Sequence, residues 1–197
     1  CIRDSNRFIR TIFPLSYDER HRIAATLDFR YGSGKRYNGP RLFGQDILSN
    51  FGVNLLMVTV SGRPYSKTTL PRRFGGVGFQ GEFNGARLPW SFSTDLRIDK
   101  SFRLFGPGDS YSPNVVVYLR VQNLFDTRNV RGVYSASGSP DDDGYLTSQE
   151  GVGAIAELGG ARPQDVELFL QSYNWRLLNP GFFTLPRRIF LGAIFEF

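Results

Sequence analysis

The chain has 197 residues, enough for one domain of ordinary size with a substantial core. Aromatic residues make up 15% of it and hydrophobic residues 41%, beside 22 glycines, and such interleaving of apolar with polar side chains is typical of alternating β-strands. The net charge of +6 arises from lysines and arginines scattered along the sequence, which argues against nucleic acid as a partner.

Apolar runs are short throughout the sequence. The longest, residues 55–60, is far below the roughly 20 residues that a membrane-spanning helix needs. Strands of a β-barrel cross a membrane in about 9 to 11 residues and expose only every second side chain to lipid. A mean hydropathy of -0.26 is therefore compatible with a barrel.

Period-two alternation predicts about five strands in chain order. They cover residues 21–31, 50–61, 90–104, 115–134 and 189–197. The second is the weakest, because it is apolar on both faces. The third alternates throughout except at Lys100, and the fourth is expected to bulge or bend at residues 123–126 before continuing through 130–134.

One face of these strands is apolar and the other is charged. Leu27, Leu96, Leu119 and Leu191 represent the apolar face, which we expect to contact lipid. The charged side chains are expected to line a barrel lumen: Asp28, Arg30, Asp95, Arg97, Asp99, Arg120 and Glu196. Aromatic residues lie near the strand ends, as in the aromatic girdles of membrane barrels. A soluble β-sandwich would also alternate, and remains the competing interpretation.

The connections are very unequal in length. Residues 105–113 form a short turn, whereas residues 62–89 and 135–186 are long and rich in Gly, Pro, Asn and Asp. Inside the second, Pro163 near a helix start and helical spacing of apolar residues predict a helix over 163–178, ended by Asn179-Pro180. Its apolar residues, expected to pack on the barrel mouth, are Val166, Phe169, Leu170, Tyr173 and Leu177.

Several short motifs occur in the order found in one family. They are residues 17–21 (Tyr-Asp-Glu-Arg-His), 61–65 (Ser-Gly-Arg-Pro-Tyr), 88–97 from Leu-Pro-Trp to Asp-Leu-Arg, 121–126 (Val-Gln-Asn-Leu-Phe-Asp), and 139–145, found in some members. The chain also ends with an apolar side chain at every second position, namely Ile189, Leu191, Ala193, Phe195 and Phe197. Together they resemble the C-terminal barrel portion of TonB-dependent receptors, which are outer-membrane transporters, and the ending resembles the signal read by the barrel assembly machinery.

The resemblance implies that residues 1–197 are the last strands of a 22-stranded antiparallel barrel with a plugged lumen. Five strands cannot close a barrel, since the smallest bacterial examples need eight. We therefore expect a fragment of a longer protein, or a subunit that completes a barrel with other chains. Neither the N-terminal plug nor the energy-coupling box is visible. With the C-terminus in the periplasm, residues 1–20, 62–89 and 135–186 become extracellular loops.

The function implied is uptake of a ligand captured by these loops. The expected partners are outer-membrane lipid and lipopolysaccharide, the rest of the barrel with its plug, a TonB-type energy-coupling protein and the assembly machinery. A structural or adhesion barrel that binds a partner protein without transport is the alternative. We expect neither catalysis nor a cofactor, because the chain has one histidine, one cysteine and no phosphate-binding loop.

A few polar residues are weaker candidates for sites. Asp141, Asp142 and Asp143 offer oxygen ligands for calcium but lack the alternating spacing of a calcium loop, so an acidic turn is the simpler interpretation. The arginines of the first long loop could attract an anionic substrate or lipopolysaccharide phosphates, although a solvated loop is the simpler interpretation: Arg72, Arg73 and Arg87. His21 we interpret as a polar residue at a loop end. Cys1 is either a lipidated first residue or, as we expect, an arbitrary start.

Overall fold

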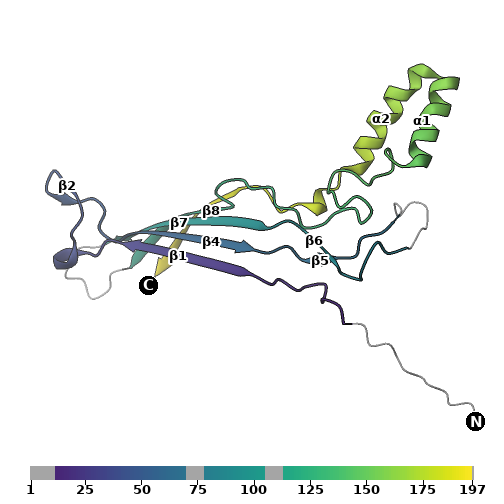
Figure 1. Cartoon of the computed structure of the whole chain (residues 1–197). Coiled ribbons are helices and arrows are strands. Elements are labelled where there is room, and N and C mark those ends of the chain that lie inside the picture. The colour runs from purple at the N-terminus through teal and green to yellow at the C-terminus, as the bar shows by residue number, and fades with distance from the viewer. Residues whose placement is uncertain (1–11, 70–77, 105–112, 197) are drawn as a thin grey trace, which may run out of the picture. The chain divides into compact units, whose positions relative to one another are not determined.

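The structure is a computed structural model that describes residues 12–69, 78–104 and 113–196 (Figure 1). The predictions made for Cys1, Arg72, Arg73, Phe197 and most of the 105–113 turn lie outside these ranges. The chain divides into two compact units. The sheet unit comprises His21–Val60, Trp90–Asn129 and Thr184–Phe197, and the loop unit comprises Cys1–Arg20, Ser61–Pro89 and Val130–Phe183.

The sheet unit is built on five antiparallel strands. They are β1 (Arg22–Arg30), β4 (Phe51–Val60), β7 (Ser91–Arg103), β8 (Asn114–Gln122) and β9 (Arg188–Glu196). Their order is β1-β4-β7-β8-β9, so β1 and β9 form the two edges and the described sheet is open rather than closed into a barrel (Figure 1). The prediction of about five antiparallel strands is confirmed.

The register of these strands explains why alternation located them so well. Leu27 on β1 lies opposite Leu55 on β4, which lies opposite Leu96 on β7. Residues opposite one another in an antiparallel pair project to the same side, so matched apolar positions build one continuous face. Each predicted end agrees with the observed end within two residues, apart from the fourth strand.

The fourth strand ends earlier than predicted. β8 stops at Gln122, and Asn123 takes the left-handed conformation with a φ of 56°. The side-chain oxygen of Asn123 accepts a hydrogen bond from the Thr127 amide at 2.9 Å, which stabilises the bend expected at this point. The predicted continuation through 130–134 is wrong, because this stretch contributes only an isolated bridge between Val130 and Phe183.

The connection between β1 and β4 was not predicted to contain structure. It holds a 3₁₀ turn, η1 (Gly34–Arg36), and a small hairpin formed by β2 (Arg41–Leu42) and β3 (Gln45–Asp46). Tyr37 is the buried residue of this connection. Its hydroxyl donates to the Pro40 carbonyl and accepts a hydrogen bond from the Leu48 amide at 3.3 Å, so one side chain ties both ends of the hairpin.

The loop unit gathers the three segments that the sequence predicts as long outer loops. It contains the short pair β5 (Pro64–Tyr65) and β6 (Ala86–Arg87), the helices α1 (Gln149–Ala161) and α2 (Pro163–Leu177), and η3 (Pro180–Phe182). The predicted helix is confirmed as α2. Neither helix, nor any other helix in the described ranges, is long and apolar enough to cross a membrane.

Helix α1 was missed because four of its thirteen residues are glycines, which are poor helix formers. Ser148 caps it by accepting a hydrogen bond from the Gly151 amide at 3.1 Å. A small core closes the unit, in which Tyr173 and Leu177 of α2 pack with Tyr145. The apolar side of α2 thus has partners inside its own unit, whereas its docking on a barrel mouth stays a prediction.

Candidate functional site

The charged face of the five-stranded sheet is the candidate functional site. Asp28 lies opposite Asn54, Asn54 opposite Arg97, and Arg97 opposite Arg120. All residues of the predicted charged set share this side by register and alternation: Asp28, Arg30, Asp95, Arg97, Asp99, Arg120 and Glu196. The face also carries apolar side chains on β4, as the sequence of that strand indicated.

An ion pair that spans three strands lies toward one end of this face, at the last residue of β1. Arg30 on β1 donates to both carboxylate oxygens of Asp99 on β7, at 3.1 and 3.3 Å. The strand between them, β4, presents Gly52, and a Cβ there would lie 3.1 Å from both the Arg30 guanidinium and the Asp99 carboxylate. The side chain of Asp99 is only 8% exposed, so this carboxylate is largely withdrawn from water but paired.

A second glycine makes room for a side chain on the neighbouring strands. Gly192 on β9 lies beneath the ring of Tyr118, since a Cβ there would come within 2.6 Å of the tyrosine hydroxyl. The guanidinium of Arg97 lies 5.1 Å from the centre of the same ring. Arg97 also approaches Asp99 at 3.5 Å, which offsets the repulsion from Arg120 directly opposite it.

A hollow opens on this face toward the end of the sheet where β9 finishes. Its wall carries the cations Arg30, Arg97 and Arg103 and the anions Asp99 and Glu196, with Ser101 and Asn114 between them. Within the described ranges no group of three or more His, Cys, Asp or Glu side chains could hold a metal ion.

The opposite face of the sheet is apolar, and it is exposed mainly on the edge strands β1 and β9, whereas the inner strands are mostly half-buried. Leu27, Leu96, Leu119 and Leu191 share it, as predicted. Four of the five residues of the predicted assembly signal also project from it: Ile189, Leu191, Ala193 and Phe195. Lys100 falls on this face by register, at its margin, where its ammonium lies 5.1 Å from the Phe102 ring and donates to the Ile47 carbonyl.

Aromatic rings occupy both ends of the apolar face. At one end His21 stacks on Trp90 at 6.0 Å with the rings 1° from parallel, and Phe125 stacks on Phe92 at 6.3 Å. At the other end the Phe29 and Tyr31 rings meet edge to face at 4.9 Å. Aliphatic side chains fill the space between these bands, including Leu27, Leu55, Leu96, Leu119 and Leu191.

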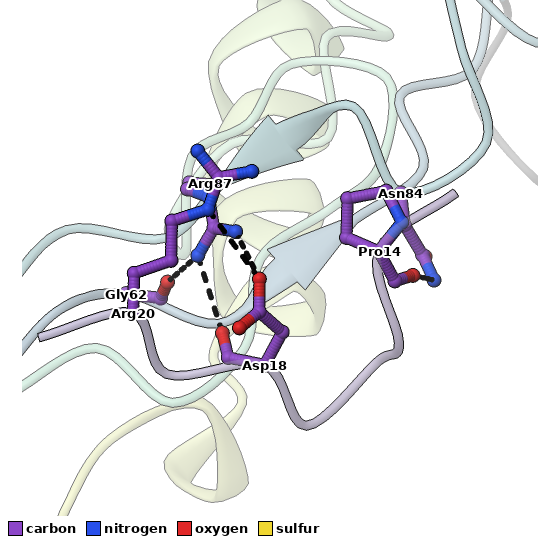
Figure 2. Close-up of polar contacts among 6 residues, drawn as sticks. All are labelled: Pro14, Asp18, Arg20, Gly62, Asn84 and Arg87. Atoms are coloured by element: carbon purple, nitrogen blue, oxygen red, sulfur yellow. Dashed lines mark hydrogen bonds and ion pairs between the residues drawn. The ribbon is translucent and has the colours of Figure 1, made fainter. Parts of the chain in front are cut away.

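A clasp around Arg87 joins two segments of the loop unit, as Figure 2 shows. The guanidinium donates to the Asp18 carboxylate at 2.5 Å and to the Asp18 and Gly62 carbonyls at 3.2 and 3.1 Å. Hydrogen bonding and attraction from Arg87, with a smaller contribution from Arg20, lower the pKa of Asp18 below its usual value. Arg87, for which anion binding was the less favoured interpretation beside a solvated loop side chain, instead forms hydrogen bonds within the chain.

The acidic turn of the loop unit also has internal partners. The carboxylate of Asp143 accepts from the Tyr173 hydroxyl at 2.6 Å and from the Tyr145 amide at 2.9 Å, and Asp142 accepts from the Gly144 amide at 2.8 Å. Burial, together with the charges of Asp143 and Asp141, raises the pKa of Tyr134. Among the described residues, Asp141, Asp142 and Asp143 form no cluster that could hold a metal ion, and Asp142 and Asp143 accept hydrogen bonds within the loop unit.

Several residues of the charged and apolar faces were not identified in the sequence. Gly52 and Gly192 became significant only when the register placed side chains over them. Asn129 was also missed. Its side-chain oxygen accepts a hydrogen bond from the Phe92 amide at 2.8 Å, and its side-chain nitrogen donates to the Phe92 carbonyl at 2.7 Å, so it replaces the backbone partner that a neighbouring strand would supply. The available signal was the pair of asparagines at 123 and 129 after a strand, since such side chains often replace backbone partners.

Comparison with known proteins finds no matching family model, no matching curated protein and no matching solved structure.

Proposed function

We propose that this chain forms part of the wall of an outer-membrane β-barrel, and that the barrel belongs to a TonB-dependent uptake receptor. In this proposal the apolar face of the sheet contacts lipid and the charged face lines the lumen. The observation that carries the proposal is the separation of the two faces, with aromatic rings at both ends of the apolar one.

The exposure of the apolar face supports a lipid environment. Ile23, Leu27 and Phe29 at one edge are 63%, 59% and 58% exposed, and Leu191 at the other edge is 77% exposed. Soluble monomers rarely leave contiguous apolar patches of more than a few hundred Å² in water. In contact with lipid chains instead of water, these apolar side chains would not incur the free-energy cost of hydration.

The spacing of the aromatic bands agrees with the thickness of an outer membrane. Phe92 and Phe102 mark the two ends of the apolar face on β7. Ten residues of strand span about 33 Å at roughly 3.3 Å each. A strand tilted by about 40° then covers roughly 25 Å along the membrane normal, which is the height of the apolar band in such barrels.

The open edges of the sheet require further strands in this proposal. In hydrocarbon the unpaired backbone groups of β1 and β9 would each cost several kcal/mol. We infer that additional strands, from the same protein or from a partner chain, pair with both edges and complete a larger barrel.

The loop segments support a receptor that captures its ligand outside the cell. Segments of the loop unit precede β1, follow β4, precede β7, follow β8 and precede β9, so they attach at one end of the antiparallel sheet. With the C-terminal end of β9 in the periplasm, this end faces outward. The resemblance to TonB-dependent receptors further implies that the ligand passes through a plugged lumen and that a TonB-type protein powers this uptake.

Cysteine labelling in intact cells tests this orientation. Thr147 in the loop unit and Gln45 in the β2–β3 hairpin connect to opposite ends of the strands. In full-length protein with Cys1→Ser and Thr147→Cys, an impermeant maleimide should react in intact cells, whereas with Cys1→Ser and Gln45→Cys it should react only after the outer membrane is permeabilised. The reverse pattern, or labelling of both in intact cells, would contradict the proposal.

Energy coupling tests the uptake function separately. Cells without the TonB-type protein should assemble the receptor and bind ligand at the surface but fail to accumulate it. Surface binding with no accumulation in either strain would favour a barrel that binds a partner without transport, and equal accumulation in both strains would contradict energy-coupled uptake.

A further inference from the structure

An apolar residue occupies an unfavourable backbone conformation at the tip of the β2–β3 hairpin. Phe43 has a φ of 51°, and Gly44 after it has a φ of 77°, as a tight hairpin turn requires. The other four non-glycine residues with positive φ in the described ranges are Asn or Asp, which tolerate this conformation. Phe43 is nevertheless 96% exposed, so contacts within the protein do not explain its presence.

The hairpin has an apolar tip, and the segment that leads into it is positively charged. Leu42 beside Phe43 is 56% exposed. The connection carries Lys35, Arg36 and Arg41 against the single acid Asp46, which pairs with Arg41 at 2.9 Å. Apolar side chains beyond a positively charged base match a bilayer surface in which phosphate groups lie above acyl chains.

The hairpin is anchored at the margin of the apolar face. The Tyr37 ring packs at 6.0 Å from the ring of Tyr31, which continues the apolar side of β1. The ammonium of Lys100, on the same side of the sheet, donates to the Ile47 carbonyl. These contacts hold both halves of the connection beside the aromatic band at this end, so the hairpin begins where the proposed lipid-facing surface ends.

We propose that the β2–β3 hairpin is a membrane-surface anchor that binds anionic phospholipid in the inner leaflet. Leu42 and Phe43 enter the boundary between headgroups and acyl chains, while Lys35 and Arg36 contact phosphates. This inference rests on the proposed function, because it places the adjoining apolar face in lipid. It adds a specific lipid contact at the periplasmic end of the sheet.

Depth-dependent fluorescence quenching tests the anchor in the full-length protein reconstituted into vesicles. An environment-sensitive dye is attached at Phe43→Cys, at the matched position Gln45→Cys in the same hairpin, or at Leu191→Cys on the apolar face, each with Cys1→Ser. Vesicles contain phosphatidylcholine with or without phosphatidylglycerol, together with a lipid that carries a nitroxide either near the headgroup, for positions 43 and 45, or deep in the acyl chain, for position 191. Each labelled protein is also prepared with Lys35→Glu and Arg36→Glu.

In vesicles with phosphatidylglycerol, quenching at position 43 should exceed that at position 45 by about threefold, and the charge reversals should remove most of this difference. Strong quenching at 191 with equal, weak quenching at 43 and 45 would overturn the anchor while leaving the barrel proposal intact. Absence of quenching at all three positions would overturn both. Strong quenching at 43 in phosphatidylcholine alone, unaffected by the charge reversals, would contradict the role of anionic lipid.

Discussion

Arg30 reaches Asp99 across an intervening strand, and Gly52 on that strand leaves the space for the contact. The pair links β1 to β7 although the two strands share no backbone hydrogen bonds in the described sheet. Because β4 between them is apolar on both faces along much of its length, its hydrophobic pattern alone specifies the pairing register weakly. The Arg30–Asp99 pair adds a polar contact that favours the observed register.

Gly52→Ala should therefore destabilise the sheet. The added methyl would lie 3.1 Å from both charged groups and separate them, at a cost of about 1 to 2 kcal/mol in the free energy of unfolding. Urea unfolding of the protein in vesicles measures it. Gly153→Ala is the matched control, because nothing lies near that Cβ in α1 and the change should stabilise the helix by about 0.5 to 1 kcal/mol. Equal effects at both positions would contradict the role assigned to Gly52.

The clasp between Asp18 and Arg87 should weaken only in acid. A carboxylate with a lowered pKa in the folded state contributes stability above its unfolded pKa of 3.8, and this contribution is lost as pH falls through the lowered folded value. The protection of the amides of residues 12–20, measured as the exchange rate relative to the unfolded chain at the same pH, should therefore hold at neutral pH and fall only below about pH 4.

Asp18→Asn should lower this protection at pH values above about 4, because the charge partner of Arg87 is removed, and should have little effect in acid, where protonation has already removed the charge. Asp165→Asn, which breaks the exposed pair with Arg162 in α2, should leave residues 12–20 unchanged. Protection that is independent of pH and of Asp18 would show that the clasp does not hold this segment.

Ser148→Ala should selectively loosen α1. The serine hydroxyl accepts from the Gly151 amide, and its loss should cost about 1 kcal/mol in a helix already weakened by glycines. Hydrogen exchange over residues 149–161 reports the change. Ser172→Ala is the control, since that hydroxyl donates back to the Phe169 carbonyl within α2 and its removal should have little effect.

Tyr173→Phe should destabilise the loop unit, and calcium should not restore it. The Tyr173 hydroxyl is bonded to the Asp143 carboxylate, so its loss should cost about 1 to 2 kcal/mol. Thermal unfolding with calcium or with a chelator measures both effects. A rise in stability on adding calcium to the unchanged protein would revive the metal site at Asp141, Asp142 and Asp143.

How far the sequence predicts this structure depends on the range of the interactions involved. Strict alternation located the strands and assigned Arg97 and Leu96 to opposite faces, because the period of a strand is a local property. Helix α2 was predictable from Pro163 and the spacing that follows it. Helix α1 was not, because its glycines remove the propensity signal and Ser148 alone does not identify a cap.

Non-local contacts account for what the sequence could not supply. The Arg30–Asp99 pair joins residues 69 apart and depends on a glycine in a third segment. The continuation through 130–134 failed because the Asn123 side chain ends the strand by taking over backbone partners, which alternation does not detect. The structured connection around Tyr37 lacks any periodic pattern, so it was invisible before the fold was known.

The most direct test of the lipid-facing surface compares arginine at two leucines on opposite faces. Leu96 lies on the apolar face opposite Leu55, whereas Leu56 lies on the charged face opposite Asp95. In the full-length protein in vesicles, Leu96→Arg should lower the free energy of unfolding by about 2 to 4 kcal/mol, and Leu56→Arg by less than about 1 kcal/mol. Equal costs at the two positions, or folded Leu96→Arg protein recovered outside any membrane fraction, would contradict the account.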